Sequence, residues 1–248
     1  HDLMASLNGS LGNHAHANGI SLELYGKGYV LGPDAGIGKY LYSGLDYSEY
    51  YSQMPAHNTV VVDGVSSYPV MMSQHGFKVI ASYPEVSENQ VSSKKLSEQK
   101  EKMTYATVSF IEPETQSEQQ RTTVIVKTSD KGGFYIDVFR SKRKDGNDKT
   151  HDYFYHNLGQ EMKVVDATTD KPLQMAPTEE LAFAGGHLYA YSYIYNKVSA
   201  DMTSSIKTQF VTKITDDKVV EAMNGQKEIT MTMWMKADEN RTIFKALS

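Results

Sequence analysis

The chain has 248 residues, of which 40% are hydrophobic, and a formal net charge of −5 at pH 7. This length can bury a sizeable core as one large or two small domains. The acidic balance argues against nucleic acid or an anionic membrane as a partner, because both require a basic face. No apolar run approaches the ~18 residues of a membrane span, so we expect no membrane insertion. Cysteine is absent, and any metal site must therefore use histidine and carboxylate ligands.

The start of the chain predicts a polar entry segment. Residues 1–12 are polar and contain glycine, which is typical of a loop. The chain begins with His1 and has neither a basic n-region nor an apolar h-region, so we expect no signal peptide. We expect a processed chain, a fragment or one domain of a larger protein.

The first motif that carries chemistry is HAHAN at residues 14–18. His14 and His16 are two residues apart, so on a strand both imidazole rings would point to the same face. Two short strands are predicted next, at Ser21–Tyr25 and Tyr29–Leu31, with a hairpin turn between them at residues 26–28.

Two further candidate ligands follow at predicted strand ends. Asp34 sits in a glycine and proline turn, and His57 immediately precedes the apolar run Thr59–Val62, which predicts a buried strand. The long connection between them is rich in tyrosine and includes Tyr50 and Tyr51. Two imidazoles and a carboxylate at strand ends can converge in a sheet, and zinc accepts such nitrogen and oxygen ligands. Histidines on strands are also often simple hydrogen-bonding residues.

A cupin-type metal site is a weaker alternative, because it also begins with two histidines separated by one residue on a strand. It would require an acidic residue four or five positions after the second histidine. Ile20 and Ser21 occupy those positions here.

The rest of the chain predicts many short strands. The segment from Ser87 to Lys102 is rich in Ser, Glu, Gln and Lys and is expected to be a solvated loop. After it, apolar residues alternate with polar or aromatic ones in several segments, namely 106–110, 134–138, 188–195, 206–214 and 229–235. We therefore predict an all-β fold, a large antiparallel β-sandwich of two stacked sheets with few or no helices, spanning residues 1–248 as a single domain.

Two motifs in the same order resemble the heparinase II/III-like superfamily of polysaccharide lyases. The matching sequences are HAHANGISLELYGKGYVLGPDAG at residues 14–36 and AHNTVVVDG at residues 56–64. A weaker similarity is found in DYFYHNLG at residues 152–159. Family members typically read HAHAD, and here Asn18 replaces the aspartate. Together with the residue pattern, the resemblance predicts His16, Asp34 and His57 as ligands of one zinc ion, with His14 facing a substrate cleft.

The resemblance further implies β-elimination on an acidic, uronic-acid-containing polysaccharide. In related lyases the zinc is mainly structural, and a histidine, a tyrosine and residues of a separate helical domain carry the proton chemistry. His14 matches the family's cleft histidine, and Tyr50 or Tyr51 is the expected tyrosine. The resemblance also implies an N-terminal α/α-toroid domain upstream of residue 14 in the same protein, and a periplasmic or secreted location. Glycosaminoglycan, alginate and ulvan lyases would look alike in this segment.

Two other functions stay open at this point. A non-catalytic carbohydrate-binding sandwich could use the tyrosines of the 189–195 segment as a sugar-stacking platform, although strand propensity alone enriches tyrosine. A purely structural domain with a stabilising metal is the third reading. An aromatic-rich strand is predicted at His151–Leu158, and its two histidines, His151 and His156, are expected to be structural.

Overall fold

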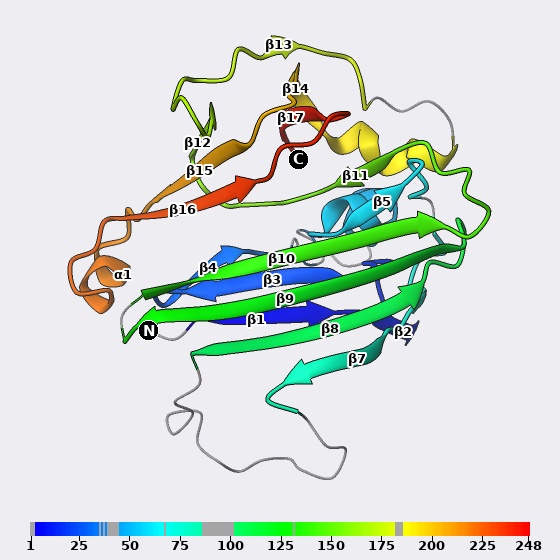
Figure 1. Ribbon diagram of the computed structural model, residues 1–248, viewed down its shortest axis with the longest axis horizontal. Helices are drawn as coiled ribbons and strands as arrows, with labels where there is room; N and C mark the ends of the chain where they lie inside the picture. Colours follow the sequence, from blue (N-terminus) through cyan, green and yellow to red (C-terminus); the bar gives the residue numbers. More distant parts are fainter. Residues whose placement is uncertain are drawn as a thin grey trace. The chain divides into compact units, whose positions relative to one another are not determined.

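The computed structural model describes residues 3–34, 36, 38, 45–66, 68–85, 102–130, 132–181 and 186–248. The chain divides into two compact units (Figure 1). Unit 1 comprises His1–His156 with Gly185–Ala190, and unit 2 comprises Asn157–Ala184 with Tyr191–Ser248. The expectation that residues 1–248 form a single domain stays a prediction.

Unit 1 contains two main antiparallel sheets. The three-stranded sheet has the order β1-β3-β4, with β1 at Met4–Asn8, β3 at Ser21–Gly26 and β4 at Tyr29–Gly32. The four-stranded sheet has the order β10-β9-β8-β7, with β7 at Lys78–Tyr83, β8 at Met103–Ile111, β9 at Ser117–Ser129 and β10 at Gly132–Arg143. Two short pairs complete the unit: β2 (Ser10–Asn13) with β6 (Met72–His75), and β5 (Val60–Val62) with β11 (His151–Tyr153).

The core of unit 1 follows from strand alternation. Val108 and Phe110 are two residues apart on β8, so both side chains lie on the inner face, where they contact the fully buried Ile20. Partly buried neighbours of this core are Leu7, Phe77 and Phe139. Burial of each large apolar side chain contributes roughly 1.5–3 kcal/mol to folding. The Tyr135 hydroxyl donates a hydrogen bond to the Tyr25 carbonyl and so links the two sheets.

Unit 2 is built from two three-stranded antiparallel sheets. One has the order β12-β15-β16, with β12 at Glu161–Asp166, β15 at Ile206–Lys213 and β16 at Glu228–Met235. The other has the order β13-β14-β17, with β13 at Ala176–Pro177, β14 at Tyr195–Asp201 and β17 at Thr242–Leu247. Val164, Ile206 and Ile243 form its buried core, surrounded by methionines and Leu173.

Helical segments are short throughout the described residues. A π-helical turn covers Tyr47–Tyr51, and 3₁₀ segments cover Met54–Ala56 and Gly186–Tyr193. The α-helix α1 spans Asp217–Ala222, where the Asp216 carboxylate caps the first turn. Within the described residues, no helix is both long and apolar enough to cross a membrane. The prediction of an all-β sandwich with few helices is confirmed.

Three local predictions were wrong. Residues 4–13 form β1 and β2 rather than a loop, because Leu7 of β1 pairs opposite Leu22 of β3 and the sheet supplies the hydrogen bonds. The strand predicted from 151 to 158 ends at Tyr153. The tyrosine ladder at 189–195 is mostly 3₁₀ helix, and the buried residues Ala190, Tyr191 and Ile194 have the spacing of a helical turn. Most of the segment Ser87–Lys102 lies outside the described residues.

Candidate functional site

The segment that carries the first two histidines is irregular. His14 lies in a turn with a φ of 57°, just beyond the end of β2, and its N–H donates to the Met71 carbonyl at 2.8 Å. The Ala17 N–H donates to the Ser52 carbonyl at 2.9 Å, which holds the segment against the chain that precedes His57. The expectation that both histidines share one face of a strand was therefore wrong. His14 is exposed, whereas His16 is only partly exposed.

Three of the predicted site residues come together. The Asp34 Oδ2 lies 2.6 Å from the His57 Nδ1, and the ring centroids of His16 and His57 are 5.4 Å apart. The His57 side chain is 1% exposed, while that of Asp34 is 23% exposed, so the cluster has a buried side and an open side. No contact brings the exposed His14 into this cluster in the described part of the chain.

The charges within the cluster favour metal-binding protonation states. Burial raises the pKa of the Asp34 carboxyl, but the hydrogen bonds from His57 and from the Gly36 N–H outweigh it and hold that pKa below its usual value. Burial lowers the pKa of the His16 imidazole, and the neighbouring His57 lowers it further. An ionised carboxylate and a neutral imidazole are the forms that bind metal ions.

The donor set fits a transition metal such as zinc, which binds imidazole nitrogen and carboxylate oxygen. The His57 Nε2 is buried and has no hydrogen-bond partner among the described residues, whereas the His57 Nδ1 faces the Asp34 Oδ2 at 2.6 Å. The carboxylate oxygen and the ring nitrogen that face each other are the two donor types that zinc accepts. As the side chains stand, no three His, Asp or Glu residues of the described ranges form a ready coordination group. The ligand roles stay a prediction.

The tyrosines of the loop between Asp34 and His57 have different surroundings. Tyr47, in the π-helical turn, meets the His16 ring edge-on with centroids 5.6 Å apart. Tyr50 is buried, and its ring packs against that of the partly exposed Tyr51 at 5.4 Å. Tyr47 therefore contacts a predicted ligand, and its place in the loop between two candidate ligands is the sequence signal for this contact.

Asn58 joins the segment that carries His57 to β3 and to the residue before Asp34. Its side-chain amide donates to the carbonyls of Leu22 (2.9 Å) and Pro33 (3.0 Å), and its side-chain oxygen accepts from the His156 N–H at 2.6 Å. Pro33 directly precedes Asp34, and Asn58 directly follows His57. The His156 Nε2 is also hydrogen-bonded, to the Pro55 carbonyl at 2.8 Å, which agrees with the structural role expected for this histidine.

Arg121 supports the same region from β9 and was missed by sequence reasoning. Its side chain is fully buried and binds Asp137 through two hydrogen bonds of 2.8 Å. The remaining terminal nitrogen donates to the carbonyls of Ile20 (2.7 Å) and Asn58 (2.6 Å). In the sequence, only strand alternation points to the inward position of Arg121: it follows Gln119 by two residues and so lies on the same buried face of β9.

The chain combines an all-β sandwich with a cluster of two histidines and one aspartate. Comparison with known proteins shows which family has this combination. The model of the Heparinase II/III-like, C-terminal family matches residues 2–125, which is half of the chain and contains His16, Asp34 and His57. The chain belongs to the heparinase II/III-like family of polysaccharide lyases.

A curated relative supports this assignment. The chain is 31% identical over 175 residues to an endo-acting ulvan lyase of Formosa agariphila, a match that covers 66% of this chain. The same match covers 20% of the ulvan lyase, so the chain corresponds to about a fifth of the length of that relative.

Proposed function

We propose that this chain forms the metal-bearing wall of a cleft in which uronic-acid-containing polysaccharide is cleaved by β-elimination. The observation that carries the proposal is the convergence of His16, Asp34 and His57 from three separate segments, inside the region that matches the family. The ulvan lyase relative supports an acidic polysaccharide as substrate.

His16, Asp34 and His57 would hold the zinc ion. When bound, the ion would supply a fixed positive charge and a rigid link between the segments that carry these residues. The hydrogen bonds of Asn58 and Arg121 hold the backbone directly before Asp34 and directly after His57. Such a fixed backbone suits a structural zinc ion rather than a catalytic one.

The exposed His14 is the group proposed to meet the substrate. In β-elimination a base takes the C5 proton of the uronate, the electron pair forms the C4–C5 double bond, and the C4–O bond breaks with protonation of the leaving oxygen. A positioned imidazole can stabilise the negative charge that develops on the uronate carboxyl group, which is usually a large contribution to catalysis. Its exposure leaves His14 accessible to a polymer chain.

A tyrosine is proposed for the proton transfers, together with a base from the upstream α/α-toroid domain. Of the two expected tyrosines, Tyr51 is partly exposed whereas Tyr50 is 3% exposed, so Tyr51 is the better candidate for direct contact with a sugar. Such a tyrosine acts as base and then acid only if nearby positive charge lowers its pKa from ~10. Degradation of a polysaccharide polymer also favours a periplasmic or secreted location.

The proposal is tested by assaying this chain alone, and within the longer protein that contains it, on ulvan, alginate and hyaluronan. The unsaturated uronate product is followed by its ultraviolet absorbance. We expect product from at least one polymer with the longer protein and none with the isolated chain, because the upstream base is absent. Absence of unsaturated product from every polymer with the longer protein would overturn the lyase assignment. Normal release by the isolated chain would overturn the division of the site between two domains.

A further inference from the structure

The outer face of the four-stranded sheet carries a row of polar and basic side chains. Lys78 of β7 pairs with Ser109 of β8, Ser109 pairs with Gln120 of β9, and Gln120 pairs with Arg140 of β10. Residues paired across neighbouring strands lie on the same face of a sheet. Three strand spacings separate Lys78 from Arg140, which is about 14 Å.

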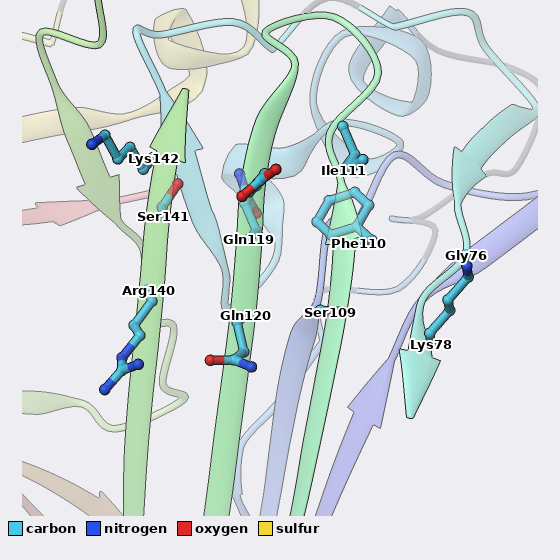
Figure 2. Close-up of a pocket in the computed structure, with 11 residues that line it drawn as sticks. Gly76, Lys78, Ser109, Phe110, Ile111, Gln119, Gln120, Arg140, Ser141 and Lys142 are labelled. Atoms are coloured by element: carbon cyan, nitrogen blue, oxygen red, sulfur yellow. The ribbon is translucent and has the colours of Figure 1, made fainter. Parts of the chain in front are cut away.

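The next row on this face adds a third cation. Lys142 lies two residues beyond Arg140 and pairs with Glu118, which in turn pairs with Ile111. The two rows line a surface groove of about 630 Å³. Figure 2 shows the lining side chains distributed over the neighbouring strands of the sheet.

The three cations of the groove are free to bind anions. Lys78, Arg140 and Lys142 are exposed, and in the described ranges none of them is within ion-pair distance of a carboxylate. Arg143, the next residue along β10, shows the contrast, because it is paired with both Asp63 and Asp145. Three cations and one carboxylate, Glu118, line the groove, so its local charge is positive although the whole chain has a net charge of −5.

An aromatic pair continues the same face. Tyr105 is four residues before Ser109 on β8, so it lies on the same side of the sheet, about 13 Å along the strand. Its ring stacks with that of Tyr83 of β7, with centroids 6.4 Å apart and an interplanar angle of 21°. Tyr83 is 42% exposed, so part of this aromatic surface is open to a flat apolar ligand such as the face of a sugar ring.

We propose that this outer face, which we call the β7–β10 face, is a second, non-catalytic binding surface for acidic polysaccharide. Lys78, Arg140 and Lys142 would bind carboxylate or sulfate groups, Ser109 and Gln120 would hydrogen-bond hydroxyl groups, and the aromatic pair would stack on a sugar ring. The residues are separate from the cluster of His16, Asp34 and His57, which makes no contribution to the groove. The surface would hold the polymer near the enzyme between cleavage events, and it does not depend on the elimination chemistry.

The test measures binding of the 248-residue chain to four polymers by affinity electrophoresis. The probes are alginate, which carries only carboxylates, dextran sulfate, which carries only sulfates, neutral dextran, and a single-stranded DNA oligonucleotide. The variant combines Lys78→Gln, Arg140→Gln and Lys142→Gln, and the control combines Lys218→Gln, Lys227→Gln and Lys236→Gln. The control residues are also exposed, and the change in net charge is the same.

We expect the groove variant to bind alginate, dextran sulfate or both at least about tenfold more weakly, a loss of ~1.4 kcal/mol, while the control variant stays within about twofold of the native chain. Binding should weaken with added salt, since exposed charges are screened. Tyr83→Ala should weaken binding by a smaller factor. Equal losses in the groove and control variants would overturn the proposal. So would equally tight binding of neutral dextran, stronger binding of the oligonucleotide than of either acidic polysaccharide, or no binding of either acidic polysaccharide by the native chain.

Discussion

Two buried histidines of unit 1 have similar burial but different surroundings. His57 and His75 are both 1% exposed, and each has an Nε2 without a hydrogen-bond partner among the described residues. The Nδ1 of His57 faces the Asp34 carboxylate, and a second imidazole lies alongside. The Nδ1 of His75 accepts from the Gly19 N–H at 2.8 Å. His75 must therefore carry its proton on the unpartnered Nε2.

The surroundings of His75 close it off from ligands. Its ring packs against Tyr68, with centroids 4.9 Å apart, and against Phe110 at 5.5 Å. The nearby Glu112 is buried, and neutral donors occupy its oxygens, among them the Tyr68 hydroxyl at 2.6 Å and the Thr115 N–H at 2.6 Å. Asp34, by contrast, keeps a partly exposed side chain. A buried imidazole with an unpartnered nitrogen is thus not sufficient for a metal site, which also needs a second donor and a path to solvent.

The largest expected effect concerns Arg121, which supports both histidines. It binds the carbonyl of Ile20, next to the Gly19 that holds His75, and the carbonyl of Asn58, next to His57. Arg121→Met should destabilise the chain by about 3–5 kcal/mol, because it leaves Asp137 as a partly buried charge without its partner. Urea unfolding measures the loss.

The matched control for Arg121 is the exposed Arg140 on the neighbouring strand. Arg140→Met should change the unfolding free energy by no more than about 0.5 kcal/mol. Arg121→Lys should recover only part of the stability, since lysine cannot reproduce the paired hydrogen bonds to Asp137. Equal stability of the Arg121→Met and Arg140→Met variants would contradict the supporting role of Arg121.

The second prediction concerns the exposed His14, whose loss should affect turnover but not stability. In the complete enzyme, His14→Ala should lower turnover by about 10²-fold, because a positioned acid–base or charge-stabilising group is lost. Metal content and melting temperature should stay close to those of the native enzyme, since the His14 side chain is exposed. Steady-state kinetics and thermal unfolding of the same preparations measure both. A His14→Ala enzyme with native turnover would remove this residue from the site.

A third prediction concerns acid sensitivity at His75. Burial lowers the pKa of His75 from 6.5 to about 4; Glu112 opposes this shift, and His57 adds to it. Between these two pH values the unfolded chain binds a proton that the folded chain excludes, so stability falls as the pH falls. From pH 7 to pH 5 this group should cost roughly 2 kcal/mol.

His75→Asn is the informative variant for this pH effect. The asparagine side-chain oxygen can replace the Nδ1 as acceptor for the Gly19 N–H, but asparagine does not titrate. Urea unfolding at several pH values should therefore give a shallower loss of stability for the variant than for the native chain. Parallel curves for the two proteins would show that His75 is protonated equally in the folded and unfolded states.

Sequence reasoning predicted the elements better than it predicted the connections. The alternation at 229–235 became β16, and three of the side chains that the two family motifs contain lie close together. The turn at His14 was not predictable, because a positive φ at a non-glycine residue is set by the surrounding structure. Arg121 was missed for a related reason. On a strand an inward arginine has the same spacing as an inward leucine, and only the folded chain reveals Asp137 as its partner.

The most direct test of the metal site is the zinc content of the purified chain, measured by elemental mass spectrometry without chelator in the preparation. We predict about one zinc ion per native chain and per His75→Asn chain, and almost none for His57→Ala. Chelation should lower the melting temperature of the native chain and leave that of His57→Ala unchanged, because a metal that binds only the folded state stabilises it. Native chain without stoichiometric metal, or His57→Ala that retains it, would contradict a metal site formed by His16, Asp34 and His57.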